Sequence, residues 1–465
     1  MTRVHRLIML AAALLLFGCE QPTVLERIQA RGELRVATRI SPTCYFEGAQ
    51  GPTGLEYDLV TRFAEELGVT ARFVHPRPLR RLLADVRSGR VDMAAAGLTV
   101  TPEREQTLRF TRPYQTVTQQ LVYRRGGRRP KDMNDLGDGV LEVIADSAHE
   151  ENLMDLQSSG LDRLRWVASN GLTSEQLLAR LDAGEIDYTV VDSNELALNR
   201  RFYAHVEPAL DISEPQDIAW AFPDWQDSSL ADAADAFLAK VEADGTLPNL
   251  IAHYYGYTGR LKFVDKRDFW RHVAQRLPAY QPHFEEAAEQ VGLDWRLLAA
   301  VGYQESHWDP QAVSPTGVRG IMMLTRDTAK QVGAADREDA RSSILGGAQY
   351  LRHIEAKIPE RIPEPDRLWL ALAGYNVGFG HLEDARVLTQ RQGGNPDRWL
   401  DVKQRLPLLS KKAYYSTLKH GYARGREPVT YVENVRNYFD LLVWWTNNAP
   451  PATQPQDELQ TAGAD

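Results

Sequence analysis

The chain has 465 residues, of which 43% are hydrophobic and 25% are charged, and its formal net charge is −9. This length is too great for one ordinary domain, so two or three soluble globular domains are expected. The negative net charge and the lack of a long basic run argue against nucleic acid as a partner. No clustered His/Cys spacing indicates a metal, and no cofactor is expected.

The N-terminus has the pattern of a secretory signal. Arg3 and Arg6 precede an apolar run over residues 7–17, which is too short to span a bilayer as a mature helix. The run ends in Leu16-Phe17-Gly18-Cys19, which resembles the lipobox of bacterial lipoproteins, although Phe17 is bulkier than the usual small residue. An uncleaved anchor or ordinary secretion is the alternative interpretation.

The lipobox resemblance implies a signal peptide over residues 1–19 and a lipidated Cys19. Several acyl chains on one residue hold a protein at a membrane more firmly than one chain does. Glu20 follows the cysteine, not the Asp that often marks inner-membrane retention. The periplasmic face of the outer membrane is therefore the expected location. Cys44 then has no internal disulfide partner and is expected to be buried.

Strands and helices alternate after the leader. Residues 20–29 are expected to form a tether, 34–38, 71–74 and 92–95 strands, and 57–68 and 79–88 helices. This alternation predicts βαβ units around a mostly parallel sheet.

Four motifs in this region resemble the family 3 solute-binding proteins, which take up polar amino acids. They are Gly54-Leu55-Glu56-Tyr57-Asp58-Leu59, Gly89-Arg90-Val91-Asp92-Met93, Leu98-Thr99-Val100-Thr101-Pro102-Glu103-Arg104 and Phe110-Thr111-Arg112-Pro113-Tyr114. The resemblance covers residues 32–256. It implies two lobes that close around a ligand. The lobe crossings are expected near residues 120–123 and 218–222.

The same resemblance implies three ligand-binding residues. Arg104 would clamp the ligand α-carboxylate, since a guanidinium can bind a carboxylate through two hydrogen bonds. Thr99 would add a hydrogen bond, and Asp192 would receive the ammonium group. A free amino acid or a muropeptide satisfies this pattern. As alternatives, Arg104 is a surface residue at a helix start, and Asp192 is a helix cap.

Residues 257–268 are expected to link this domain to a mostly helical one over residues 269–447, and residues 448–465 are expected to be a disordered tail. In the helical part, Asp294 is a good N-cap and Pro310 a good helix stop. Glu305 shares a helix face with apolar residues. A desolvated carboxylate has a raised pKa, which suits a general acid. A buried ion pair or a cap for a neighbouring helix is the alternative role.

Motifs around Glu305 resemble the lytic transglycosylases with a lysozyme-like SLT domain. They are Glu305-Ser306-His307-Trp308-Asp309-Pro310, Ser314-Pro315-Thr316-Gly317, Gly320-Ile321-Met322-Met323, Ser343-Ile344-Leu345-Gly346-Gly347-Ala348-Gln349-Tyr350-Leu351 and Gly374-Tyr375-Asn376-Val377-Gly378-Phe379-Gly380-His381. Many relatives have Gln at the position of Met323 and Ala at that of Gly374. The Met-rich form and the fused binding domain indicate one branch of these enzymes.

This resemblance implies cleavage of peptidoglycan glycan strands with Glu305 as acid and then base. The C6 hydroxyl of N-acetylmuramic acid would attack, which leaves a 1,6-anhydro end. Tyr375 would line the catalytic centre, while Ser306, Met323 and Asn376 are candidate substrate contacts. Two alternatives stay open: a lysozyme-like hydrolase that uses water, and a receptor whose helical domain only anchors it to the wall.

The expected architecture is therefore multidomain. A two-lobed α/β domain resembling the periplasmic binding proteins precedes a mostly α lysozyme-like domain. The expected partners are peptidoglycan, an amino acid or muropeptide in the first domain, and a membrane through the lipid anchor.

Overall fold

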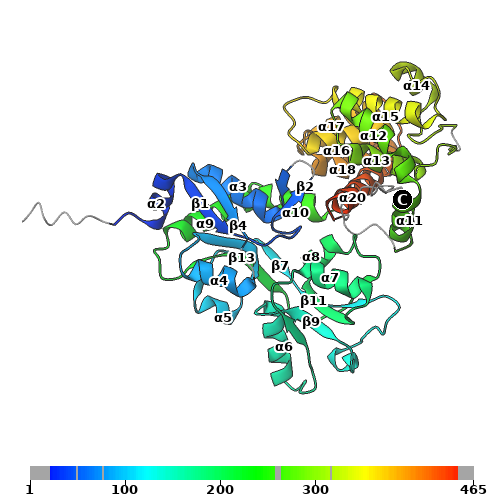
Figure 1. Ribbon diagram of the computed structural model, residues 1–465. Coiled ribbons are helices and arrows are strands. Elements are labelled where there is room, and N and C mark those ends of the chain that lie inside the picture. Colours follow the sequence, from blue (N-terminus) through cyan, green and yellow to red (C-terminus); the bar gives the residue numbers. More distant parts are fainter. Residues whose placement is uncertain (1–20, 49–50, 76–77, 257–262, 315–316, 449–465) are drawn as a thin grey trace, which may run out of the picture.

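The computed structural model describes residues 21–48, 51–75, 78–256, 263–314 and 317–448. An α/β domain of two lobes precedes a helical domain (Figure 1), which confirms the predicted fold class. Cys19, the signal peptide and the tail from residue 449 lie outside the described residues.

The first lobe is built on a six-stranded sheet with the order β4-β1-β5-β13-β6, with β7 also paired to β13. β1 runs parallel to β4 and β5, whereas β13 is antiparallel to its neighbours. Its strands are β1 (Glu33–Ala37), β4 (Thr70–Val74), β5 (Met93–Thr99), β6 (Leu108–Phe110), β7 (Gln115–Val117) and β13 (Gln216–Pro223), with a hairpin of β2 (Phe46–Gly48) and β3 (Gly51–Thr53). Its helices are α2 (Val24–Arg31), α3 (Leu55–Leu67), α4 (Leu79–Arg87), α5 (Pro102–Glu105), α9 (Ser229–Ala243) and α10 (Thr246–Tyr255).

The second lobe has a five-stranded sheet with the order β10-β9-β11-β8-β12. Its strands are β8 (Gln119–Arg124), β9 (Leu141–Ile144), β10 (Val167–Ser169), β11 (Tyr188–Asp192) and β12 (Val206–Asp211), and its helices are η1 (Met133–Leu136), α6 (Ala148–Ser158), α7 (Ser174–Ala183) and α8 (Ser193–Asn199). The chain crosses between lobes at Thr118 and after Asp211, slightly before each expected crossing.

The predicted tether is wrong for most of its length, because α2 is a packed helix. Thr23 and Glu26 form a capping box at its start, and Val24 and Ile28 are buried. The backbone N–H of Val24 also donates to Asp227 over 2.9 Å. A capping box supplies partners for the free N–H groups of a first helical turn. The first lobe therefore begins at this helix.

The helical domain begins at Phe263, inside the stretch expected to be a linker. Its elements are α11 (Phe263–Gln275), α12 (Leu277–Val291), α13 (Trp295–Ser306), α14 (Arg326–Val332), α15 (Ala340–Glu355), α16 (Asp366–Val377), α17 (Phe379–Arg391), α18 (Trp399–Arg405), η2 (Leu406–Ser410), α19 (Lys412–Tyr415) and α20 (Arg426–Asn448). Among the described residues, none of the helices combines the length and apolar character needed to cross a membrane.

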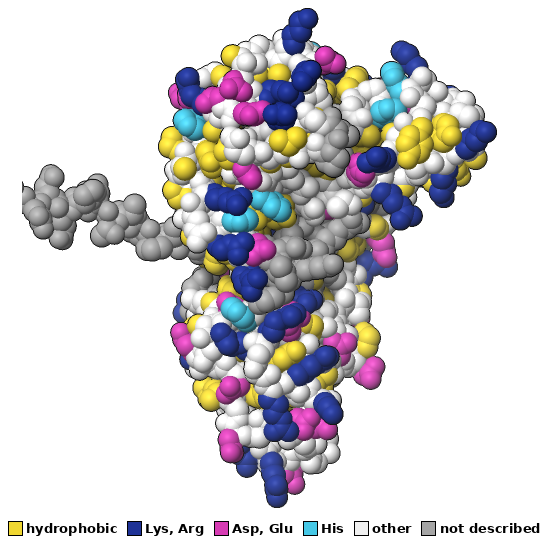
Figure 2. Space-filling model, turned by 90° about the vertical axis from the view of Figure 1, so that its right-hand side faces the viewer, with side chains coloured by type: hydrophobic (Ala, Val, Ile, Leu, Met, Phe, Trp, Pro, Cys, Tyr) yellow, Lys and Arg dark blue, Asp and Glu magenta, His cyan; other side chains and the backbone are white. Residues whose placement is uncertain are grey.

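Helix α20 carries contacts from the helical domain to both lobes (Figure 1). Towards the second lobe, Asp440 forms an ion pair of 2.6 Å with Arg201, and the ring of Trp444 stacks on Phe202 with centroids 5.4 Å apart. Towards the first lobe, Arg436 donates to the carbonyl of His253 over 2.6 Å. On the face in Figure 2, acidic and basic side chains are interspersed.

Candidate functional site

Helix α13 places Glu305 at its last turn. The side chain of Asp294 caps the helix start by accepting from the N–H of Arg296, and residues 297–303 are all buried. The helix ends abruptly because His307 and Trp308 both adopt left-handed backbone conformations, with φ of 53° and 58°. This reversal brings the following loop back over the end of the helix.

Small residues let that loop approach α13 closely. A Cβ on Gly302 would lie 2.9 Å from Phe284 and 3.3 Å from the sulfur of Met322. A Cβ on Gly347, in α15, would lie 2.7 Å from the Met322 side chain. Glycine at both positions therefore lets Met322 pack between the two helices beneath the site.

Burial raises the pKa of the Glu305 carboxyl to about 7, and a hydrogen bond from Tyr431 partly opposes this shift. The Tyr431 hydroxyl donates to Oε1 of Glu305 over 2.7 Å. No described residue forms an ion pair with Glu305, so the alternative of a buried Arg partner does not apply. A half-buried carboxyl with this pKa can hold a proton near neutral pH and release it.

Tyr375 lies beside this pair without donating to it. Its hydroxyl donates to the carbonyl oxygen of Met322 over 3.1 Å, while its ring stacks near that of Tyr431 with centroids 6.3 Å apart. The tyrosine that holds the carboxylate is thus Tyr431, which sequence analysis missed. An aromatic residue among the valines of an amphipathic helix has the pattern of a core residue, and Tyr431 is indeed buried.

The other predicted site residues take different positions. The hydroxyl of Ser306 lies 2.9 Å from the carbonyl oxygen of Ile321 and 3.2 Å from that of Gly302, so it binds the loop to the helix. Met323 is half-buried with φ of 46°, and Asn376 is exposed. Among the described residues, no group of His, Cys, Asp and Glu is arranged to hold a metal ion.

The cleft between the lobes brings the three predicted ligand residues near one another. Arg104 and Asp192 both have protein partners, although Nε of Arg104 is buried without a hydrogen-bond partner among the described residues. Arg104 is buried, donates to the carbonyl of Thr99 over 3.0 Å, and pairs with Glu151 of the second lobe at 3.3 Å. Burial lowers the pKa of Arg104. The alternative of a surface arginine is therefore wrong.

Asp192 stands at the start of α8 but makes no capping bond with its side chain. Its Oδ1 lies 3.1 Å from Nε2 of His149, which is also buried. Asp192 therefore holds the N-cap position of α8, as the helix-cap alternative expects, but its carboxylate contacts His149 and not the backbone of the helix. Sequence analysis missed Glu151 and His149, since charged residues in the first turns of a helix usually face solvent.

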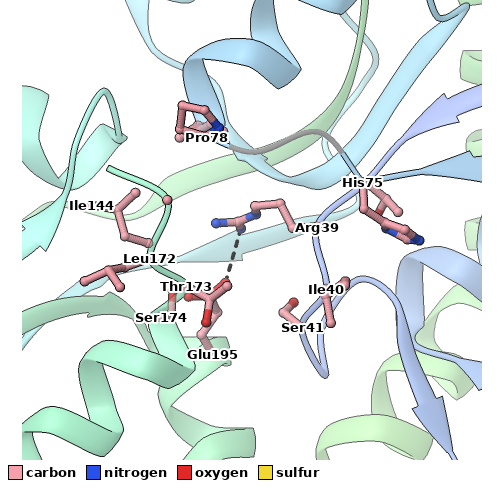
Figure 3. A pocket seen from close by; sticks show the side chains of 13 residues that line it. Arg39, Ile40, Ser41, His75, Pro78, Ile144, Leu172, Thr173, Ser174 and Glu195 are labelled. Atoms are coloured by element: carbon pink, nitrogen blue, oxygen red, sulfur yellow. Dashed lines mark hydrogen bonds and ion pairs between the residues drawn. The ribbon is translucent and has the colours of Figure 1, made fainter. Parts of the chain in front are cut away.

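A further ion pair crosses the cleft between Arg39 and Glu195, at 3.2 Å, and the two side chains point toward one another in Figure 3. A cavity of about 50 Å³ lies beside this pair. Figure 3 shows Ile40 and Pro78 on the side of the first lobe and Ile144 and Leu172 on the side of the second. Side chains of the two lobes therefore contact one another across the cleft and leave only this small cavity.

The geometry defines a class of protein: a two-lobed binding domain joined to a helical domain with one desolvated glutamate. Two family profiles match the same division: bacterial extracellular solute-binding proteins, family 3, over residues 34–257, and the transglycosylase SLT domain over residues 282–397.

Full-length relatives share both parts. The chain is 49% identical to membrane-bound lytic murein transglycosylase F 1 of Alkalilimnicola ehrlichii, over 91% of this chain and 86% of that protein. It is 48% identical to membrane-bound lytic murein transglycosylase F of Alcanivorax borkumensis, over 92% and 91% of the two chains. The chain belongs to the membrane-bound lytic murein transglycosylase F family. This is the branch that the fused domains and the Met-rich motif indicate.

Proposed function

We propose that this chain is a peptidoglycan lytic transglycosylase in which Glu305 is the catalytic acid and base. The observation that carries the proposal is the Glu305 carboxyl itself, with a pKa raised to about 7 by burial and a hydrogen bond from Tyr431. It lies within the stretch that matches the SLT domain. A second carboxylate, which most glycosidases need, is not required when the substrate supplies the nucleophile.

In the proposed mechanism, the Glu305 proton passes to the oxygen of the β-1,4 bond between N-acetylmuramic acid and N-acetylglucosamine, and the bond from that oxygen to C1 breaks. The glutamate, now a carboxylate, takes the proton of the C6 hydroxyl as this oxygen bonds to C1. The product is a 1,6-anhydro end, and no water is consumed. Tyr431 holds the carboxylate during the interval in which it is charged.

The proposed glycan-binding site is lined by four residues: Ser306, Met323, Tyr375 and Asn376. Asn376 is exposed and free to approach the sugar, whereas Tyr375 and Ser306 fix the backbone of the loop. Met323 offers an apolar side chain where many relatives have an amide. The subsite at this position is therefore proposed to rely on packing against the sugar ring.

The test is mass spectrometry of sacculi digested by the soluble chain from residue 20. Anhydro-muropeptides that disappear with Glu305→Gln support both the reaction and the acid. Products with reducing ends identify a hydrolase instead. A folded protein that gives no products would support the receptor alternative, provided that added muropeptide does not restore activity.

The two-lobed domain over residues 32–256 is proposed to sense a ligand that carries a carboxylate and an ammonium group. Thr99, Arg104 and Asp192 are the proposed ligand contacts, and the ligand would have to replace Glu151 at Arg104 and His149 at Asp192. Such a ligand can shift the lobes only if it binds the open and closed forms with different affinity. The test is the rate at which the soluble chain lyses sacculi, with and without saturating amino acids or muropeptides. A rate that none of these ligands changes would contradict the proposal.

The chain is also proposed to reach the periplasmic face of the outer membrane through a lipid on Cys19. The support is the lipobox resemblance, together with relatives that are named membrane-bound. Incorporation of labelled palmitate into the chain, abolished by Cys19→Ser, is the expected result. Labelling that survives this substitution would contradict the anchor.

A further inference from the structure

Positive charge is concentrated in one segment of the helical domain, residues 411–426, which runs from the end of η2 to the first residue of α20. This basic segment contains no Asp or Glu, although the whole chain has a net charge of −9. Its five cationic residues are all exposed: Lys411, Lys412, Lys419, Arg424 and Arg426. A local excess of one sign of charge attracts partners of the opposite sign.

Most of this charge is not neutralised within the protein. Arg424 forms an ion pair of 3.3 Å with Glu427, the residue that follows the basic segment. The other four cationic side chains form no ion pair with any residue that the structure describes. The basic segment therefore presents four exposed charges that remain available to a partner.

The backbone of the basic segment is fixed by contacts that do not use these charges. Asp384 is only 4% exposed, and its two carboxylate oxygens accept from the backbone N–H groups of Lys419, over 3.2 Å, and His420, over 2.8 Å. A Cβ on Gly425 would lie 1.6 Å from the carbonyl oxygen of Leu406, so the backbone passes directly against η2 at this point. The segment is thus an ordered surface from which the cationic side chains extend.

Helix stability does not explain where two of these charges stand. Lys412 is the first residue of α19, and Arg426 is the first residue of α20. The start of a helix carries partial positive charge from its free N–H groups, so a cation there is unfavourable. These side chains are therefore better explained by an anionic partner than by the fold.

The basic segment lies beside the proposed catalytic site. Arg426 begins α20, and Tyr431, in the second turn of the same helix, donates to Glu305. The ring of His420 packs against Gly380 so closely that a Cβ there would lie 2.7 Å from it. Gly380 belongs to the first turn of α17, which directly follows α16 and its residues of the proposed glycan-binding site.

We propose that the basic segment binds carboxylates of the peptide stems of peptidoglycan, next to the bond that Glu305 cleaves. This inference rests on the proposed function, and it assigns a second contact to the same substrate. Each stem hangs from a muramic acid unit and carries several free carboxylates. Exposed cations attract such groups at little desolvation cost and so steer the strand into place. The basic segment thereby favours strands that carry peptides over strands that have lost them.

Anionic phospholipid is another partner that exposed lysines and arginines attract. The position of the basic segment favours peptidoglycan, since its two neighbours, α17 and the start of α20, belong to the surroundings of Glu305. A membrane held against the segment would lie where the glycan strand has to approach.

Sedimentation of the soluble chain from residue 20 with purified sacculi tests the proposal. Every sample carries Glu305→Gln, which keeps the sacculi intact. A second batch of sacculi has its carboxylates converted to amides with carbodiimide and glycinamide. At low ionic strength, Lys419→Gln/Arg426→Gln should weaken binding to untreated sacculi at least tenfold, and the amidated sacculi should bind both proteins equally. The difference on untreated sacculi should disappear at high ionic strength, because salt screens exposed charges.

The matched control removes the same two charges elsewhere in the helical domain. Arg326 and Lys330, on α14, are exposed and form no ion pair with a described residue, so Arg326→Gln/Lys330→Gln should leave the affinity unchanged. The cleft between the lobes is the same in all of these proteins, so binding there cannot produce the difference. If the melting temperature shows that Lys419→Gln/Arg426→Gln does not fold, Lys411→Gln/Lys412→Gln replaces it.

Equal affinity of the test and control variants for untreated sacculi overturns the proposal. So does a tenfold loss that is the same on amidated sacculi, since the charges then do not act on carboxylates. Loss of binding to phosphatidylglycerol vesicles, with unchanged binding to sacculi, assigns the basic segment to the membrane instead. Sedimentation does not depend on glycan cleavage. Failure of the proposed reaction would appear in the analysis of the digestion products and not here.

Discussion

The hydroxyl of Tyr431, on α20, donates to Oε1 of Glu305, at the end of α13, over 2.7 Å. These residues are 126 positions apart, and the contact links the Glu305 carboxyl to the helix that also touches both lobes of the first domain. Burial raises the pKa of Glu305, and the Tyr431 bond lowers it. The carboxyl thus reaches a pKa near 7 through two opposing effects.

Tyr431→Phe should raise the pKa of Glu305 above its present value of about 7. The hydrogen bond from Tyr431 stabilises the carboxylate, and the substitution removes it. The protonated acid then persists to higher pH, so the alkaline limb of kcat/KM on sacculi should move upward. The rate itself should fall by roughly 10–100-fold, since the charged carboxylate loses a donor of about 1.5–3 kcal/mol. Tyr422→Phe, at a side chain that is 57% exposed, is the control. An unshifted limb in Tyr431→Phe would contradict the role of this bond.

Glu305→Gln should remove activity yet stabilise the fold at alkaline pH. The folded-state pKa of about 7 exceeds the ordinary value of 4.5, so the native state binds the proton more tightly than the unfolded chain. The carboxyl therefore contributes stability fully below pH 4.5, and this contribution is lost as the pH rises through 7. At pH 8 the glutamine variant should be more stable by up to ~3 kcal/mol, and at pH 4 it should show no such gain. Urea unfolding at both pH values measures the difference, and a gain that is independent of pH would exclude this linkage.

Sequence analysis selected Glu305 as the candidate acid because two independent signals agreed, its apolar helix face and the motif that follows it. It missed Tyr431 because nothing local distinguishes a tyrosine that binds a buried carboxyl from a core residue on an amphipathic helix. The pairing depends on how α13 and α20 pack, which only the folded chain specifies. In contrast, the capping box of Thr23 and Glu26 was readable in sequence, and α2 could have been predicted from it.

In the cleft between the lobes, too, local sequence signals identify some residues, and only the folded chain identifies their partners. Arg104 and Asp192 could be assigned from motifs, and the structure places both in the cleft. Their partners Glu151 and His149 could not, because α6 carries them into the cleft from the second lobe. Sequence periodicity predicts which face of a single helix is buried. It does not predict which residues meet across the cleft, because those contacts depend on how the two lobes are placed.

Tyr375→Phe should act on the loop rather than on the acid. Its hydroxyl donates to the carbonyl of Met322, a buried residue, so the substitution leaves that oxygen without its donor. The expected cost is about 1–2 kcal/mol of unfolding free energy. The alkaline limb of the pH profile should stay in place, in contrast to Tyr431→Phe. A shifted limb with unchanged stability would mean that Tyr375 acts directly on Glu305.

Glu151→Gln should favour opening of the two lobes in the absence of ligand. The ion pair between Arg104 and Glu151 crosses the cleft, and the amide leaves the buried guanidinium with a weaker partner. Small-angle scattering of the soluble chain should give a larger radius of gyration than for the unmodified protein. Glu103→Gln, at an exposed carboxylate next to Arg104 in sequence, should leave it unchanged. Equal radii for Glu151→Gln and the unmodified chain would show that this pair does not hold the lobes closed.

Asp440→Asn should loosen the contact between the second lobe and α20. Arg201 is buried, and its ion pair with Asp440 is 2.6 Å long, while the carboxylate is partly exposed. Loss of the charge should lower the free energy of local opening by about 1–2 kcal/mol, because the ion pair between Asp440 and the buried guanidinium is removed. Amide exchange in α8 and in the C-terminal half of α20 should therefore quicken by roughly tenfold. Glu427→Gln removes an exposed ion pair with Arg424 at the start of the same helix and should leave these amides unchanged. Equal exchange in both variants would mean that the pair of Arg201 and Asp440 does not stabilise this interface.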